Sequence, residues 1–273
     1  MEYIEKYRRY LLLRNLSDRT VKSYIGNIIL TSKKIGKNPI DVDENDLAIF
    51  MTKEGSRTLS SSSQNLIINS FKSFYKVIHE RDFDKSIIPR PKREQKQPDI
   101  LSVDEMQMII SSIQNIKHKT IILIMYSGAL RVSEILNLKI KDIDSDNNKI
   151  NIRLAKGKID RFIPLDEKLV NLMRDYWDMY KTNEYLFEGS KGGRYSESSV
   201  QNIIKSAVKK LNINKKISTH SIRHSAITHF IKNGVNLRVV QKLAGHKNIN
   251  TTANYVKIYD EDIMGIESLL KDL

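Results

Sequence analysis

The C-terminal third of the chain contains His220-Ser-Ile-Arg-His224, then Leu243-Ala-Gly-His246, then Thr251-Thr-Ala-Asn-Tyr255. These three segments supply a hydroxyl nucleophile, a guanidinium and imidazole groups. Two segments far upstream add further cations: Gly128-Ala-Leu-Arg-Val-Ser-Glu134 contains a second arginine, and Lys156-Gly157 lies in a strand-like stretch. We interpret the set as a site that attacks a phosphodiester and needs no metal ion.

Each residue type suits one task at phosphorus. Arg131 and Arg223 stay protonated and can bond both non-bridging oxygens in a bidentate manner, which would stabilise the charge of the transition state. Tyr255 is the candidate nucleophile. Its hydroxyl has an ordinary pKa of about 10, so it needs nearby positive charge or a base, which the arginines and His220 would provide. Lys156 is the candidate acid for the departing oxygen.

A helix is predicted to carry the first of these segments. Ser218-Thr219 is a typical N-terminal cap, and Gly234 is a typical C-terminal stop. Within this helix, His220, Arg223 and His224 lie three and four residues apart, so they share its first turn. A phosphate bound there would also face the positive end of the helix dipole.

Two shorter helices are predicted after it. The first covers 236–244 and leaves His246 at its end, where a side chain can project into a cleft. Thr251-Thr252 would start the second helix, which carries Tyr255. Each helix therefore presents one candidate residue.

The upstream candidates are placed by strands and by a buried helix. Residues 149–153 and 161–165 have the pattern of strands, so Lys156 would lie at the tip of a hairpin. The apolar run 121–126 predicts a buried helix that leads to Arg131. The expected fold class is mainly α, with a small antiparallel β-sheet.

With these boxes in this order, the chain resembles the tyrosine recombinases of the Xer and integrase family. The family's Gly-Leu-Arg-x-Ser-Glu, Lys-Gly, His-x-x-Arg and Leu-Gly-His motifs and its tyrosine are matched along more than 120 residues. The resemblance implies a catalytic set made of Arg131, Lys156, His220, Arg223, His246 and Tyr255. Four positions depart from the family pattern or offer rivals: Ala129 replaces the usual glycine, Ala244 replaces a frequent leucine, Lys158 is a weaker alternative to Lys156, and Tyr259 is a second candidate nucleophile.

The resemblance also implies a two-domain DNA clamp. Residues 1–88 would form a helical core-binding (SAM-like) domain that includes a long amphipathic helix over 59–80. Residues 89–98 would form a basic, proline-containing linker, and 99–273 the tyrosine recombinase catalytic domain. We expect no additional N-terminal arm-binding domain, which favours a compact, Xer-like member.

The implied activity is site-specific recombination of DNA through a 3′-phosphotyrosyl intermediate, without ATP, metal or cofactor. The partners would be double-stranded DNA with paired target sites and further copies of the chain, as a tetramer joined by the tail 259–273. The expected role is the resolution of chromosome or plasmid dimers. The alternatives are an integrase or excisionase of a mobile element, a type IB topoisomerase and a DNA-binding protein without catalysis.

Composition agrees with a nucleic-acid partner. The formal net charge is +14, and both halves contribute, since residues 1–90 contain 16 basic and 11 acidic side chains and residues 98–273 contain 27 and 20. The absence of cysteine excludes disulfides and thiolate metal sites and is compatible with the cytoplasm. The first residues lack the apolar stretch of a signal peptide, and no run is long enough to span a membrane.

Several histidines can also be interpreted without a catalytic or metal-binding role. His220 and His224 have the spacing of a zinc pair, but the arginine between them would repel a dication, which disfavours a metal site. His224 is interpreted as a packed residue behind the site, and Glu134 as a residue that orients Arg131 or its helix. No function is assigned to His79, His118 or His229.

Overall fold

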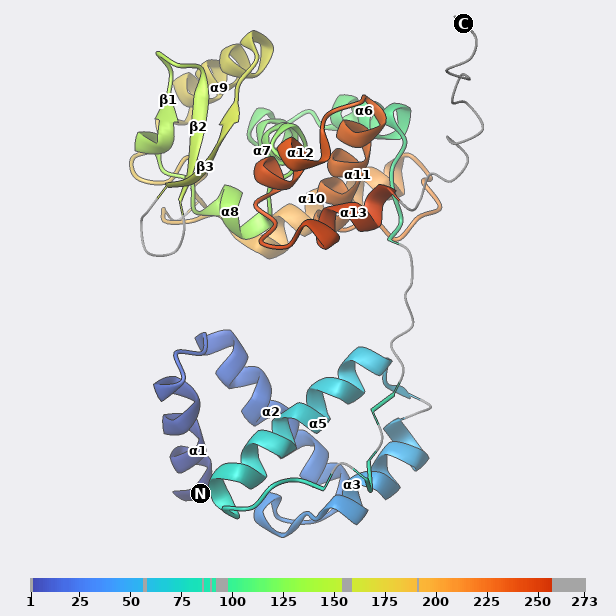
Figure 1. Ribbon diagram of the computed structural model, residues 1–273. Coiled ribbons are helices and arrows are strands. Elements are labelled where there is room, and N and C mark those ends of the chain that lie inside the picture. The colour runs from blue at the N-terminus through green and yellow to red at the C-terminus, as the bar shows by residue number, and fades with distance from the viewer. Residues whose placement is uncertain are drawn as a thin grey trace, which may run out of the picture. The chain divides into compact units, whose positions relative to one another are not determined.

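The computed structural model describes residues 2–55, 58–84, 86–88, 90–91, 98–153, 159–190 and 192–256 (Figure 1). The chain divides into two compact units, residues 1–96 and residues 97–273. Most of the expected linker, residues 92–97, lies outside the described residues, as do the hairpin tip at 154–158 and the tail at 257–273.

The first unit is built from helices. They are α1 (Glu2–Leu13), α2 (Asp18–Ile35), the 3-10 helix η1 (Pro39–Asp41), α3 (Glu44–Phe50), the π-helical turn η2 (Met51–Gly55) and α5 (Ser61–Ile78). The hydroxyl of Ser17 accepts the Thr20 N–H and caps α2, and Ser60 caps α5 in the same way. The buried faces of α1, α2 and α5 form one core that includes Tyr7, Ile28 and Phe71.

The second unit is mainly helical and contains one small sheet. Its elements are α6 (Val103–Ser112), α7 (Ile116–Ser127), α8 (Val132–Leu136), η3 (Ile140–Asp142), β1 (Ile143–Asp144), β2 (Lys149–Arg153), β3 (Ile159–Pro164), α9 (Glu167–Tyr180), α10 (Glu197–Lys210), α11 (Thr219–Lys232), α12 (Leu237–Ala244) and α13 (Ile249–Val256). The strands are antiparallel in the order β1-β2-β3. The predicted fold class is confirmed.

Helix α7 forms the centre of this unit. Ile121, Ile122, Ile124 and Met125 are all fully buried, so the helix is enclosed on every side rather than along one stripe. Each such side chain contributes about 1.5–3 kcal/mol of hydrophobic stabilisation. The enclosure explains the apolar run in the sequence. Among the described helices, none combines the length and apolarity that crossing a bilayer requires.

The last three described helices pack together. Figure 1 shows α11, α12 and α13 (orange to red) side by side, and each of the three contacts the other two. Ser218 caps α11, as expected from the sequence, and Gly245 ends α12 in a left-handed conformation with φ +63°. Helix α13 begins at Ile249, two residues before the predicted start. This arrangement, together with the contact of α12 with β3, sets the geometry of the candidate site.

Candidate active site

Arg131 lies in the sharp turn between α7 and α8. Ala129 adopts a left-handed backbone conformation with φ +46°, and the N–H of Leu130 donates to the Met125 carbonyl at 2.9 Å. The turn reverses the chain, and Arg131 becomes the N-cap residue of α8. Its side chain remains 40% exposed, so the guanidinium is anchored at one end and accessible to a ligand at the other.

Glu134 joins three arginines. One carboxylate oxygen accepts from Nη1 of Arg131 at 2.8 Å, and the other accepts from Nη2 of Arg161 at 2.8 Å and lies 3.8 Å from Nη1 of Arg223. The Arg131 N–H also donates to Glu134, at 2.8 Å. Burial alone would raise the pKa of Glu134, but the Arg161 contact, followed by that of Arg131, holds it below its ordinary value. The carboxylate is therefore charged at neutral pH.

Arg223 is buried in the first turns of α11 and is held by two carbonyl groups. Its Nη1 donates to the carbonyl of Ala129 at 2.5 Å, and its Nη2 donates to the carbonyl of Ala244 at 2.7 Å. Burial, reinforced by repulsion from Arg131, lowers the pKa of Arg223 to about 10. The group stays charged at neutral pH, and its remaining N–H donors are free of these two bonds and can face a ligand.

Arg161 is a site residue that the sequence interpretation missed. It lies on β3, is 4% exposed, and donates through Nε to the carbonyl of Leu243 at 2.6 Å. Gly245 allows this approach, because a Cβ at that position would lie 2.6 Å from Nη1 of Arg161. The available signal was a basic residue at an inward-facing position, since Arg161 is opposite the buried Ile152 of β2.

His246 follows α12 and faces the same cluster. Its Nδ1 is 2.8 Å from the hydroxyl of Thr252. Burial is the main cause that lowers its pKa to about 4, and the positive charges of Arg223 and Arg131 lower it further. The imidazole is therefore neutral at neutral pH and can bond an oxyanion only as a neutral donor.

Tyr255 is buried on α13. It packs with Ala129, Ala226 and Ala244, which come from three other segments of the site. Its hydroxyl forms a short hydrogen bond with Nδ1 of His224. Burial raises the pKa of Tyr255, and the positive charge of Arg223 opposes this effect. The hydroxyl is therefore protonated at neutral pH in this arrangement.

His220 and Lys156 complete the predicted set. His220 lies in the first turn of α11 and is exposed, with its ring centroid 6.5 Å from that of His224. Lys156, like its alternative Lys158 and the rival nucleophile Tyr259, lies outside the described residues. The structure thus brings Arg131, Arg223, His246 and Tyr255 around one centre, with His220 at its edge. Among the described residues, no group of three or more His, Asp or Glu side chains is placed to hold a metal ion.

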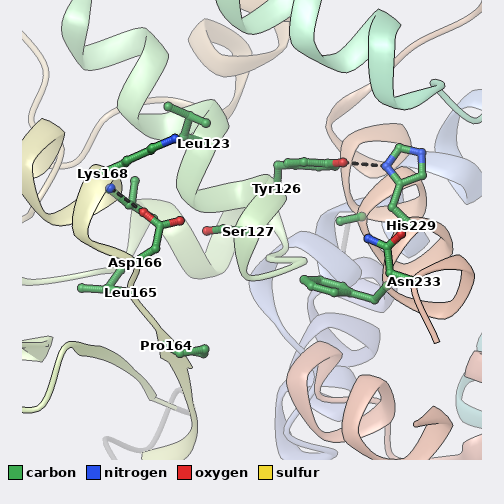
Figure 2. Close-up of a pocket in the computed structure, with 12 residues that line it drawn as sticks. Leu123, Tyr126, Ser127, Pro164, Leu165, Asp166, Lys168, His229 and Asn233 are labelled. Atoms are coloured by element: carbon green, nitrogen blue, oxygen red, sulfur yellow. Dashed lines mark hydrogen bonds between the residues drawn. The ribbon is translucent and has the colours of Figure 1, made fainter. Parts of the chain in front are cut away.

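A separate pocket of about 660 Å³ lies between α7, α11 and the start of α9 (Figure 2). Its lining is mostly apolar and contains none of the six candidate residues. The hydroxyl of Tyr126 and Nδ1 of His229 are hydrogen-bonded at 2.6 Å on its wall. His229, to which the sequence assigned no role, therefore has a structural partner. His118, which also has no role assigned from the sequence, forms a hydrogen bond of 3.0 Å between its Nε2 and the hydroxyl of Tyr195.

Comparison with known proteins gives concordant matches for both units. Residues 99–262 match the phage integrase family, and residues 3–85 match the phage integrase N-terminal SAM-like domain. A putative integrase/recombinase of Sinorhizobium fredii is 32% identical, with 94% of this chain and 84% of that protein covered. Tyrosine recombinase XerA of Pyrococcus horikoshii is 31% identical, with 94% and 89% covered. The fold is similar to that of the XerH site-specific recombinase bound to a palindromic difH substrate, with a TM-score of 0.76, 20% identity, and 92% and 80% covered.

Proposed function

Because the chain belongs to the phage integrase family of tyrosine recombinases, we propose that it is a site-specific DNA recombinase whose nucleophile is Tyr255. One observation carries the proposal: Tyr255 packs with Ala129 and Ala244, whose carbonyl groups hold Arg223. Glu134 in turn links that arginine to Arg131. A tyrosine, two arginines and a neutral imidazole in one place are the groups that phosphoryl transfer by a protein nucleophile requires.

In the proposed mechanism, the Tyr255 oxygen attacks a scissile phosphate of DNA. Arg131 and Arg223 bind its non-bridging oxygens, and both guanidiniums are already held in place, so little reorganisation is needed as charge develops. His246 donates a neutral hydrogen bond to the same phosphate. The phosphorus becomes linked to Tyr255 at the 3′ end, and the 5′ oxygen leaves with a proton that Lys156 supplies.

The proposed reaction is reversible. The 5′-hydroxyl of a partner strand attacks the phosphotyrosyl link, and Tyr255 recovers its proton. Because the phosphotyrosyl bond retains the energy of the broken phosphodiester, the proposed reaction needs no ATP. The two arginines offset the charge of the phosphate, so the proposed reaction uses no metal ion either. Exchange between two duplexes requires paired sites and several copies of the chain, and we propose a tetramer on DNA joined through the tail 259–273.

Double-stranded DNA is the proposed partner of both units. The net charge of +14 supports this proposal, because phosphate neutralisation supplies much of the affinity for DNA. The XerH structure of similar fold was obtained with its difH DNA bound. Chromosomal or plasmid DNA as the substrate would place the protein in the cytoplasm.

For the biological task, we propose the resolution of chromosome or plasmid dimers, in the manner implied by the resemblance to Xer recombinases. Integration or excision of a mobile element is the second candidate, and the Sinorhizobium relative named an integrase/recombinase favours it. The target sites distinguish the two. A single site in the chromosome that recombines only with its own copy supports dimer resolution, whereas recombination between the ends of an element supports integration.

The experiment starts by finding the site. The protein is incubated with fragments of the genome that encodes it, the mixture is denatured, and the DNA covalently attached to protein is sequenced. Two copies of the recovered site are then placed as direct repeats in a supercoiled plasmid. A recombinase yields two smaller circles and leaves a plasmid without sites unchanged. Relaxation of the plasmid without sites would indicate a type IB topoisomerase, and binding without attachment would indicate a non-catalytic protein.

A further inference from the structure

We propose that His224 is the group that removes the proton from Tyr255 when the tyrosine attacks DNA. This inference rests on the proposed function and adds a catalytic residue to it. The sequence interpretation gave the activating role to His220 and the arginines and regarded His224 as a packed residue. In the structure, the imidazole in contact with the nucleophilic oxygen is that of His224.

The geometry supports direct proton transfer. Nδ1 of His224 forms a short hydrogen bond with the hydroxyl of Tyr255, and the two rings are 5.5 Å apart between centroids. His224 lies one turn into α11, so its position is fixed by the same helix that fixes Arg223. His220 is exposed, and its ring centroid lies 6.5 Å from that of His224. Among the described residues, the acceptor that contacts the hydroxyl is therefore Nδ1 of His224.

The groups around His224 keep its imidazole neutral, so that it can accept a proton. The charged or titratable groups that face it are His220 and Arg223 on its own helix, His246 after α12, and Tyr255 on α13. Burial, then His220 and Arg223, lower the pKa of His224, so the ring is neutral at neutral pH and its Nδ1 lone pair can receive the hydroxyl proton.

The step balances in protons and electrons. The Oη–H bond of Tyr255 breaks and its proton moves to Nδ1 of His224. The electron pair left on Oη forms the bond to phosphorus, and the bond from phosphorus to the 5′ oxygen breaks. Because burial raises the pKa of Tyr255, the transfer is unfavourable before attack and becomes favourable only as the oxygen bonds to phosphorus. In the reverse reaction the imidazolium returns the proton to Tyr255.

The chain offers a matched control on the same helix. The Nδ1 atom of His229 also hydrogen-bonds a tyrosine hydroxyl, that of Tyr126, at 2.6 Å. Tyr126 packs against the edge of the hydrophobic cluster that includes Tyr255, but neither His229 nor Tyr126 is one of the six candidate catalytic residues. Asparagine places a polar atom near the position of Nδ1 and can accept a hydrogen bond, but it cannot hold a proton. His224→Asn and His229→Asn therefore each remove from α11 an imidazole that hydrogen-bonds a tyrosine hydroxyl, and only the first of these imidazoles contacts Tyr255.

The test measures the rate of covalent adduct formation on a nicked suicide duplex between pH 5 and pH 9. For the wild type we expect the rate to rise with pH along an acid limb below pH 6.5 and then to level. His224→Asn should lower the plateau by about 10²- to 10⁴-fold and abolish that limb, while DNA binding and His229→Asn stay at the wild-type level. An unchanged rate, or an acid limb that persists in His224→Asn, would overturn the inference and assign the limb to His220.

Two further results separate this inference from other failures. A wild type that forms no adduct on its own site would refute the proposed function itself, whatever His224 does. A substrate with a bridging 5′ sulfur needs no protonation of its leaving group. It should not restore His224→Asn, because the missing step is at Tyr255. Restoration would mean that His224 serves the leaving group, which contradicts the inference.

Discussion

Glu134 and Arg161 form a buried ion pair, with 2.8 Å between a carboxylate oxygen and Nη2 and side chains that are only 16% and 2% exposed. The same carboxylate also contacts Arg131 and lies near Arg223, so one negative charge offsets three positive ones. The centre thus keeps a net positive charge, as a site for an anionic phosphate must. It remains folded because Glu134 reduces the repulsion among the guanidiniums.

Glu134→Gln should therefore destabilise the second unit strongly. The amide keeps the shape but removes the negative charge that contacts the buried Arg161, and breaking a buried pair in this way costs about 3–5 kcal/mol. The fluorescence of Trp177, the one tryptophan of the chain, reports unfolding of this unit in urea. Glu184→Gln is the matched control, because its pair with Lys139 is exposed at the surface and should contribute less than about 1 kcal/mol. Equal losses of unfolding free energy in Glu134→Gln and Glu184→Gln would contradict the central role of Glu134.

Gly245→Ala should be far more damaging than Gly234→Ala. Both glycines have positive φ, +63° and +75°, so each alanine adds about 1 kcal/mol of backbone strain. Only at Gly245 would the new Cβ collide with Arg161, whose guanidinium is held by Glu134 and the Leu243 carbonyl. We expect a loss of about 3 kcal/mol or more at Gly245, since a buried pair must break, against about 1 at Gly234. Similar urea midpoints for the two variants would show that Arg161 can move aside.

Ala129→Gly should be almost neutral, although Ala129 is fully buried. Removal of the methyl group loses about 0.8 kcal/mol of burial, and glycine adds unfolded-state entropy, but the change relieves about 1–2 kcal/mol of left-handed strain at φ +46°. Ala226→Gly removes a methyl from the same cluster within a regular helix, where no strain is relieved, and should cost about 2 kcal/mol. Equal costs in urea unfolding would show that Ala129 is unstrained.

The stability of the second unit should fall as pH falls from about 6.5 towards 4. The pKa of His246 is about 4 in the folded chain against 6.5 when exposed, so between these values the unfolded chain binds the additional proton. Stability therefore rises with pH across this window and is lost on acidification. His246→Asn should flatten the dependence of the urea midpoint on pH, measured through the fluorescence of Trp177. Part of the dependence should remain, because burial also lowers the pKa values of His224 and His229. If the urea midpoint of His246→Asn depended on pH as steeply as that of the wild type, the lowered pKa of His246 would be contradicted.

Much of the fold could be predicted because its signals are local. The Ser218 cap, the stop of α12 at Gly245 and the strands that flank 154–158 follow from nearest neighbours in the sequence. The contacts of Arg161 with Glu134 and Leu243 span 27 and 82 positions, and that of His224 with Tyr255 spans 31. No periodicity encodes such pairs. The motifs identified the residues that we propose to contact the phosphate, but the groups behind them became visible only once the helices were packed.

Formation of a covalent adduct with DNA decides whether Tyr255 is the nucleophile. A nicked suicide duplex containing the target site is incubated without metal with wild type, Tyr255→Phe or Tyr259→Phe, and the products are separated on a denaturing gel. We expect an adduct with wild type and Tyr259→Phe and none with Tyr255→Phe, which should still bind the duplex. An adduct that survives in Tyr255→Phe and disappears in Tyr259→Phe would contradict this expectation.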